Sequence, residues 1–217
     1  MKAFAALAIA GALFATTASA EPVMLAGGDT RVVIDISTDG ENSFTLEDLG
    51  LQAGLTGTAT LVDGAINFPI TGGELDGIAG QILHEGSGVT LTGLDTEDGT
   101  GPTLFASNFI IDTINETLFG DVMVDGEVIG EDLDLFTFDA ASVTAEALTD
   151  LDDPTLALFI TETLAGALID VFGADDFAGA RFGFAATAPQ VVPLPGALGL
   201  FLAGAGALGF IRRRRAA

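Results

Sequence analysis

Residues 55–70 decide the fold class of this chain. They read Leu55-Thr-Gly-Thr-Ala-Thr-Leu-Val62, then Asp63-Gly64, then Ala65-Ile-Asn-Phe-Pro-Ile70. Threonine and aliphatic side chains alternate before the Asp-Gly pair, and a second apolar run follows it. Because Asp-Gly is a preferred dipeptide of two-residue hairpin turns, the segment predicts two antiparallel strands joined at residues 63–64.

Short apolar runs of the same kind continue on both sides of this hairpin, with turn residues about every 8–12 residues. This spacing is typical of an all-β fold, either a β-sandwich or a barrel-like ectodomain, and not of an α/β enzyme. The further strands that we expect are residues 30–37, residues 78–84 and 89–94 as a second hairpin around Gly86-Ser87-Gly88, residues 104–111 and 117–124 around a turn at 112–116, residues 133–138 after Asp125-Gly126, and residues 180–188.

Residues 144–173 interrupt the strand pattern with helical signals. Thr144 is a capping hydroxyl, and Asp153-Pro154 reads as a helix start, with the acid as N-cap and proline at the first helical position. Gly173 would end that helix. The sequence therefore predicts one amphipathic helix that covers the sheet, with a single apolar face formed by Leu156, Phe159, Ile160, Leu164, Leu168 and Val171.

The first 20 residues have the three parts of a secretory signal peptide. Lys2 gives a positive start, residues 5–14 form an apolar run, and Ala18-Ser-Ala20 is a cleavage pattern before Glu21. The apolar run is shorter than the roughly 20 residues that a bilayer-spanning helix needs. We therefore expect the protein to be exported, with residues 21–190 as the acidic, β-rich ectodomain.

The C-terminal segment, residues 191–217, predicts a membrane anchor. Residues 191–211 contain no charged or polar side chain, and Arg212, Arg213, Arg214 and Arg215 follow directly. A helix of this length, with a rise of about 1.5 Å per residue, spans a hydrocarbon core of about 30 Å. We place the transmembrane helix at residues 194–211. By the positive-inside rule the arginines stay cytoplasmic, which leaves the ectodomain outside.

The same segment resembles the VPLPA-type C-terminal sorting signals of the PEP-CTERM class of bacterial surface proteins. The resemblance rests on Val192-Pro193-Leu194-Pro195-Gly196, an apolar span and a terminal arginine cluster, with Gly196 where Ala is usual. It implies a Gram-negative host and processing by an exosortase-like membrane protease as partner. The precursor would cross the inner membrane once, be cut near the proline motif, and pass to the cell surface or the extracellular space.

Charge and composition exclude several classes of function. All 31 acidic residues lie in residues 21–190, beside only Arg31 and Arg181, so this segment has a net charge of −29. Such a surface repels nucleic acid and anionic lipid headgroups. The chain has no Cys and one His, which excludes disulfides, thiolate sites and zinc sites built from several imidazoles.

A second resemblance, to HtaA-like β-rich bacterial surface domains, covers residues 67–139. It rests on Phe68-Pro-Ile-Thr-Gly-Gly73, Leu83-His-Glu-Gly-Ser-Gly-Val-Thr-Leu91 and Asn108-Phe-Ile-Ile-Asp-Thr113. Some members of that group bind haem through an axial side chain. Because the chain has no Tyr, we do not carry haem binding over to it.

His84 and the acidic loops are the candidate chemical groups. Alternation places Ile78, Gly80, Ile82 and His84 on one strand face. We expect His84 at the strand end, held by a nearby carboxylate such as Glu85. No Gly-x-Ser-x-Gly pattern marks a nucleophile beside it. Calcium is the metal that carboxylate-rich loops would suit, and the candidate ligands are Asp35, Asp39 and Glu41 in one loop and Asp95, Glu97 and Asp98 in another.

Neither loop has the spacing of an EF-hand, and the acids also fit a solubilising surface. We therefore predict a non-enzymatic cell-surface or extracellular-matrix protein without a required cofactor. Two alternatives stay open: a calcium-dependent adhesion module, and a surface hydrolase that uses paired carboxylates. The absence of Trp and Tyr argues against carbohydrate binding.

Overall fold

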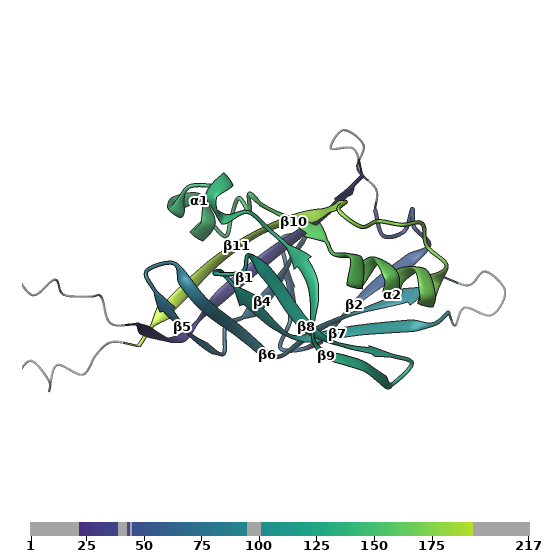
Figure 1. The fold of residues 1–217 in the computed structure, drawn as a ribbon, viewed down its shortest axis with the longest axis horizontal. Helices are drawn as coiled ribbons and strands as arrows, with labels where there is room; N and C mark the ends of the chain where they lie inside the picture. The colour runs from purple at the N-terminus through teal and green to yellow at the C-terminus, as the bar shows by residue number, and fades with distance from the viewer. Residues whose placement is uncertain (1–21, 39–42, 44, 95–100, 193–217) are drawn as a thin grey trace, which may run out of the picture.

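The structure is a computed structural model that describes residues 22–38, 43, 45–94 and 101–192 (Figure 1). The predicted signal peptide and transmembrane helix lie outside these residues. Within them, no helix is both long and apolar enough to cross a membrane. The described strands are β1 (Val23–Ser37), β2 (Leu51–Gly57), β3 (Thr60–Val62), β4 (Ala65–Pro69), β5 (Gly72–Asp76), β6 (Ala79–Gly93), β7 (Thr103–Asp112), β8 (Thr117–Val124), β9 (Glu127–Thr137), β10 (Leu156–Ile160) and β11 (Arg181–Val191).

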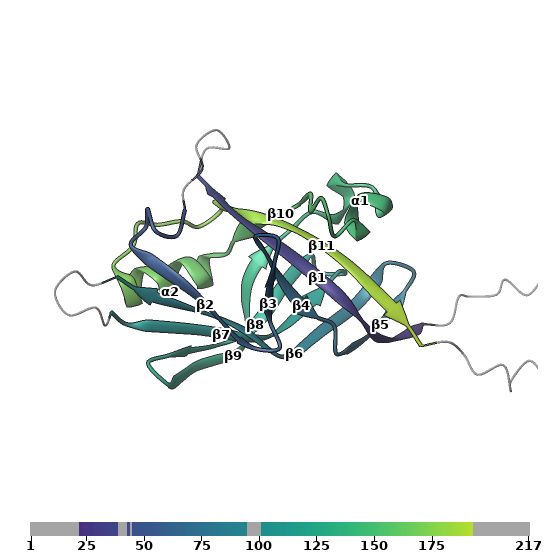
Figure 2. The ribbon, with the colours of Figure 1, turned by 180° about the vertical axis from the view of Figure 1, so that it is seen from behind.

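These strands form one antiparallel sheet that closes on itself. The hydrogen-bonded order is β11-β10-β9-β8-β7-β6-β5-β1, and β1 pairs again with β11. β4 and β3 continue from β1, and β2 adds to the C-terminal half of β6. The first and last strands therefore close the sheet, and they cross the molecule side by side in both views (Figures 1 and 2). The prediction of a mostly β fold is confirmed.

The core lies on the inner face of the closed sheet. Alternation along β7 shows how it is built, since Leu104, Ala106, Phe109 and Ile111 are buried on one face, with a one-residue irregularity between Ser107 and Ile110. All residues of the core cluster fall between positions 25 and 185. Residues 22–192 thus carry both closing strands and a core of their own, which is the requirement for folding as an independent unit.

Both predicted Asp-Gly turns are confirmed. Asp63 and Gly64 join β3 to β4 with φ angles of 51° and 85°, and Asp125 and Gly126 join β8 to β9 with φ angles of 50° and 87°. Two consecutive positive φ angles define the type I′ turn, whose twist matches that of the strands it joins. The local turn chemistry located the turns but not the full strands. The predicted strand 55–62 is split, because Leu55 to Gly57 belong to β2, which pairs with β6, and only its second part, β3, pairs with β4. The predicted strand 133–138 begins earlier, at Glu127.

The predicted second hairpin around residues 86–88 is wrong. β6 runs without reversal through this point and pairs with β5 in its first half and with β2 in its second half. Its register with β7 shifts between His84 and Gly88, and Gly86 has a φ angle of 73°. Gly86 serves a β-bulge, which needs the same left-handed backbone conformation as a turn.

The predicted covering helix is confirmed at its end and wrong at its start. Helix α2 (Glu162–Phe172) ends at Gly173, which has a φ angle of 63°, and buries Leu164 and Leu168. It does not begin at Asp153-Pro154, because Thr161 is its N-cap and accepts from the backbone N–H of Leu164. The apolar run before it is strand β10, whose inward residues pack in the core. Thr144 caps the short helix α1 (Ala145–Thr149), as predicted, and a 3-10 turn η1 (Ala140–Ser142) precedes it.

The two ends of the described chain meet at one end of the molecule, which we call the terminal pole and define by Val23, Met24, Val191 and Val192. Leu25 pairs with Val191, and the backbone N–H of Val192 donates to the carbonyl of Met24 at 2.9 Å. The side chains of these four residues are exposed, between 37% and 55%. The segments that precede and follow the closed sheet therefore attach at the same place.

Candidate functional site

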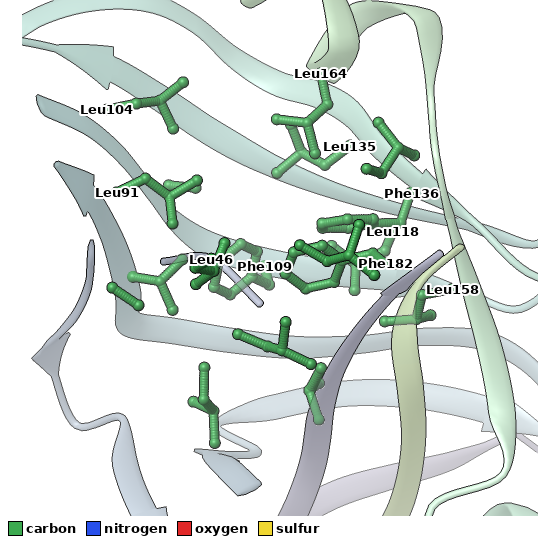
Figure 3. Close-up of a pocket in the computed structure, with 18 of the residues that line it drawn as sticks. Leu46, Leu91, Leu104, Phe109, Leu118, Leu135, Phe136, Leu158, Leu164 and Phe182 are labelled. Carbon is green, nitrogen blue, oxygen red and sulfur yellow. The ribbon is translucent and has the colours of Figure 1, made fainter. Parts of the chain in front are cut away.

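An apolar cavity lies inside the closed sheet, with a volume of about 100 Å³. Leucine and phenylalanine side chains from several strands and from α2 point into a common space in Figure 3. Leu104 and Leu135 are 1% exposed, and Leu158 is 3% exposed. Of the lining residues that the structure describes, only Thr30 and His84 carry polar side-chain atoms.

Those two polar residues belong to one buried chain of hydrogen bonds. The Nε2 atom of His84 lies 2.8 Å from the Oγ1 atom of Thr30, which in turn lies 2.8 Å from the Oγ1 atom of Thr187 on β11. The Nδ1 atom of His84 lies 3.3 Å from the carbonyl oxygen of Phe109. Because a carbonyl only accepts, we assign the ring proton to Nδ1, which leaves Nε2 to accept from the Thr30 hydroxyl.

Burial keeps this histidine neutral. Desolvation lowers the pKa of His84 to about 4, although the hydrogen bond to Phe109 and the charge of Asp29 act in the opposite direction. The ring is 1% exposed, and Phe68 packs edge-on against it with 6.4 Å between ring centroids. A neutral imidazole with both nitrogens engaged is held in place structurally, and it has no free nitrogen for a metal or a substrate.

The predicted partner of His84 was wrong. Glu85 follows it on the strand and is exposed, whereas the actual partners are Thr30 and Phe109, which are 54 and 25 positions away. The expected alternation of Ile78, Gly80, Ile82 and His84 holds in part: Ile82 and His84 are buried, whereas Ile78 precedes β6 and is 69% exposed. His84 also lies within β6 and not at its end. The sequence therefore indicated the face of the histidine, and only the strand pairing identifies what it contacts.

The structure describes one of the six candidate calcium ligands. Asp35 forms an ion pair with Arg181, with 2.9 Å between Oδ2 and the guanidinium, and the same guanidinium lies 4.8 Å from the centroid of the Phe184 ring. Asp39, Glu41, Asp95, Glu97 and Asp98 lie outside the described residues. Among the residues that the structure describes, no three acidic or histidine side chains come together as a metal site. Calcium binding stays a prediction.

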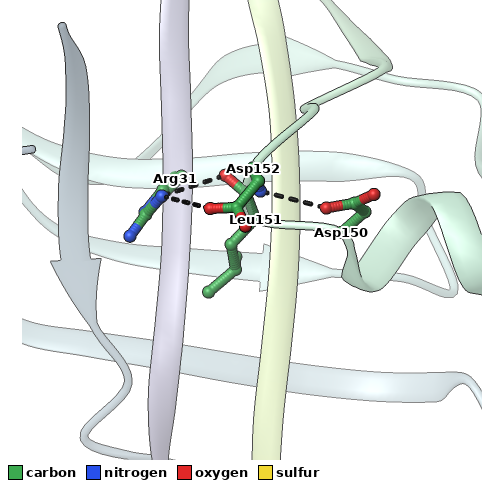
Figure 4. A network of polar contacts seen from close by, with 4 residues as sticks. All are labelled: Arg31, Asp150, Leu151 and Asp152. Atoms are coloured by element: carbon green, nitrogen blue, oxygen red, sulfur yellow. Dashed lines mark hydrogen bonds and ion pairs between the residues drawn. The ribbon is translucent and has the colours of Figure 1, made fainter. Parts of the chain in front are cut away.

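The second arginine of the described domain, Arg31, holds the loop after α1 against β1. Arg31 lies on β1 and donates to the carbonyl of Leu151 and to the carboxylate of Asp152, both at 3.2 Å (Figure 4). Asp150 accepts from the backbone N–H of Asp152 and shapes the same loop. The loop after α1 is thereby tied to β1. Since the side chain of Asp152 is 94% exposed, this ion pair contributes little by itself.

Two other carboxylates have pKa values that keep them charged. Asp112 closes the turn between β7 and β8; its desolvation raises the pKa, but hydrogen bonds from Asn115, Gln81 and Ile114 lower it overall. The backbone N–H and the hydroxyl of Thr45 lower the pKa of the exposed Asp48. A general acid needs the opposite shift, so both carboxylates act as turn residues.

The predicted export and sorting residues fall mostly outside the described chain. This holds for Ala18 and Ala20 of the signal cleavage pattern, for Pro193 to Gly196 of the proline motif, and for Arg212 to Arg215. Val192, the first residue of the motif, is described: it lies directly after the end of β11 at the terminal pole, with its side chain 45% exposed. The motif therefore begins where the closed sheet ends.

Comparisons with known proteins give little further guidance. No family model and no curated protein matches the sequence. Among solved structures, the chain is similar to the crystal structure of the heme-binding protein HtaB from Corynebacterium glutamicum, with 13% sequence identity and a TM-score of 0.38. The match covers 79% of this chain and 98% of that chain. Membership of the HtaA-like group and of the PEP-CTERM class stays a prediction.

Proposed function

We propose that this chain is an exported, non-enzymatic surface protein whose closed-sheet domain is delivered through signals at its two ends. The signal peptide carries residues 21–190 out of the cytoplasm. The segment 191–217 then holds the precursor in the inner membrane, with Arg212 to Arg215 on the cytoplasmic side. An exosortase-like protease cuts near the proline motif and passes the domain to the cell surface or the extracellular matrix.

The arrangement of the terminal pole is the observation that carries this proposal. β11 ends at Val191, and the last described hydrogen bond of the chain to the sheet is made by Val192. A cut after Val192 removes the tail without breaking a strand. Because the side chains of Val191 and Val192 are about half exposed, the start of the motif is also accessible to a protease before the cut.

The chemistry of the described interior supports a non-enzymatic role. His84 is neutral, and both of its ring nitrogens are hydrogen-bonded, one to Thr30 and one to Phe109. Asp35 is paired with Arg181. A surface hydrolase that uses paired carboxylates needs one carboxyl group with a raised pKa beside a second, charged one, whereas the pKa values of Asp48 and Asp112 are lowered.

Replacement of the proline motif tests the proposal. In a host with an exosortase-like system, the full chain is expressed with Pro193 and Pro195 both changed to Ala. We expect the variant to stay in the membrane fraction with its tail attached, while the parent reaches the surface. Pro154→Ala is the matched control, because Pro154 lies in the loop before β10, and it should be processed normally. Equal surface delivery of the motif variant and the parent would overturn the sorting mechanism.

A further inference from the structure

We propose that the apolar cavity inside the closed sheet is a binding site for a compact, uncharged, hydrocarbon-like molecule no larger than about one six-membered ring. The cavity volume of about 100 Å³ sets the size limit. An engineered protein cavity of about 150 Å³ lined by Leu, Ile and Phe binds benzene and xenon and otherwise stays dry. The proposal concerns the interior of the domain and is independent of the sorting mechanism.

The lining excludes water and polar ligands. A buried water needs two to four polar partners. Among the described residues that line the cavity, Thr30 and His84 alone have polar side chains, and these are bonded to each other. Thr30 is further bonded to Thr187, and His84 to Phe109. A ligand that carried a hydroxyl or a charge would lose its hydration without gaining a partner.

The same lining favours an apolar occupant. Side chains at an empty cavity lack contact atoms on one side and so lose dispersion energy. A ligand of matching size restores these contacts, and its transfer out of water is also favourable. The walls are rigid, because Leu104, Leu135 and Leu158 are almost completely buried on paired strands. Phe68 and Phe109 add aromatic surface, packed edge-to-face with 5.2 Å between their ring centroids.

The cavity also reaches toward the surface, which gives a ligand a route. Leu46 and Leu49, before β2, and Ala174, after α2, line the cavity while being partly exposed, and Ala53 of β2 is exposed. These residues lie on β2 and on the segments beside β2 and α2, which are not part of the closed ring of eight strands. Within the described residues, this is therefore the side from which we expect a small apolar molecule to enter.

Benzene and xenon are the probes that test this site in residues 22–192. We expect saturable changes in the methyl NMR signals of Leu104 and Leu135 and none at Leu61, whose side chain is 66% exposed. Benzene at ten times its dissociation constant should raise the melting temperature by about 3–5 °C. Phenol, similar in size but carrying a hydroxyl, should bind at least tenfold more weakly. No saturable change, or equal changes at Leu61, would overturn the proposal.

A cavity-filling variant makes the test specific. Ala106 lines the cavity and is 6% exposed, so Ala106→Leu should abolish the benzene shift. Ala145→Leu is the matched control on the exposed face of α1 and should bind benzene as the parent does. If Ala106→Leu does not fold, Val89→Leu adds less volume to the same cavity and should weaken binding at least threefold. Unchanged binding in the folded filling variant refutes the site.

Discussion

The backbone N–H of Val192 donates to the carbonyl oxygen of Met24 at 2.9 Å and fastens the end of the described chain to its first strand. Directly before it, Val191 pairs with Leu25 across the seam between β1 and β11. Val192, the first residue of the proline motif, is therefore also the last described residue that is hydrogen-bonded to the sheet. This relationship links the fold to the proposed processing, because cleavage just beyond it would leave the domain intact.

Truncation at the seam should show where the domain ends. A chain ending at Val192 should melt at the same temperature as one ending at Gly196, since no strand residue is lost. A chain ending at Pro189 loses the pairs of Gln190 with Gly27 and of Val191 with Leu25, and also the hydrogen bond from Val192 to Met24. Loss of one or two ladder hydrogen bonds costs about 1–2 kcal/mol, or a few degrees. Calorimetry on the three purified chains distinguishes these outcomes, and equal melting temperatures of all three would show that the seam ends earlier.

Stability should fall on acidification because of His84. Its folded pKa of about 4 lies below the unfolded value of about 6.5. The unfolded chain therefore binds the proton more readily, and stability present at pH 8 is lost as the pH falls toward the folded pKa. The expected loss between pH 8 and pH 5 is about 2 kcal/mol. Urea unfolding at several pH values measures it.

The variant His84→Gln isolates this contribution. Gln stays neutral throughout, so the pH dependence between pH 8 and pH 5 should largely disappear, while overall stability falls through the lost packing and hydrogen bonds. The lowered pKa values of Asp48 and Asp112 have the same sign, but they act only as the pH drops through the unfolded carboxyl value of about 4. A slope that persists unchanged in His84→Gln would contradict the assignment to this imidazole.

Replacing Thr30 should lower the free energy of unfolding more than replacing Thr187, although their hydroxyls bond to each other. Thr30→Val leaves the buried Nε2 atom of His84 without its donor, and an unsatisfied buried acceptor costs about 1–3 kcal/mol. Thr187→Val removes only the outer member of the chain, and Thr30 keeps its bond to His84. Thr187 is also half-buried, so water can partly replace it. Equal urea midpoints for the two variants would argue against the assigned direction of the hydrogen bonds.

Salt should stabilise the domain by screening its own acidic surface. Residues 21–190 carry a net charge of −29, and self-repulsion of this size weakens as the Debye length falls to about 3 Å at 1 M salt. We expect the melting temperature to rise by several degrees between low and high NaCl. Calcium chloride and magnesium chloride at matched ionic strength provide the comparison. A larger rise with calcium alone would support the loops that contain Asp39, Glu41 and Asp95 to Asp98 as a calcium site.

Two ion pairs hold β1, one from Arg181 on β11 and one to Asp152 in the loop after α1, and they should differ in strength. Arg181 and Asp35 are 19% and 30% exposed, and the guanidinium also lies over Phe184, so Arg181→Gln should cost about 1–2 kcal/mol. Arg31→Gln should cost less than about 1 kcal/mol, because Asp152 is almost fully exposed. Denaturant unfolding of both variants gives the ranking. If Arg31→Gln cost more than Arg181→Gln, the contact between β1 and the loop after α1 would contribute more to stability than the exposure of Asp152 indicates.

Local turn chemistry made part of the fold predictable from sequence. The Asp-Gly turns at residues 63–64 and 125–126 need only two consecutive positive φ angles, which these dipeptides supply. The bulge at Gly86 uses the same backbone conformation without reversing the chain, and only the pairing of β6 with β5 and β2 decides between the two. The run Leu156 to Ile160 is equally ambiguous, since a short apolar stretch suits a strand or a helix.

The candidate site depended on contacts that no local pattern contains. Alternation put His84 on the inner face, but Thr30 is 54 positions away and reaches it only because β1 and β6 meet inside the closed sheet. The cavity likewise exists only once strands from β1 to β11 and helix α2 surround it. The closing pair β1–β11 joins residues more than 140 positions apart, and the sequence predicted these strands without predicting that they pair.

The intact mass of the protein recovered from the cell surface tests the central claim most directly. We predict a species that begins at Glu21 and ends within or just before the motif Pro193 to Gly196. It should lack the four arginines at 212–215 and retain the melting temperature of residues 22–192. A surface species that still carries the segment through Arg215, or a full-length chain that remains in the cytoplasm with its first 20 residues, would contradict it.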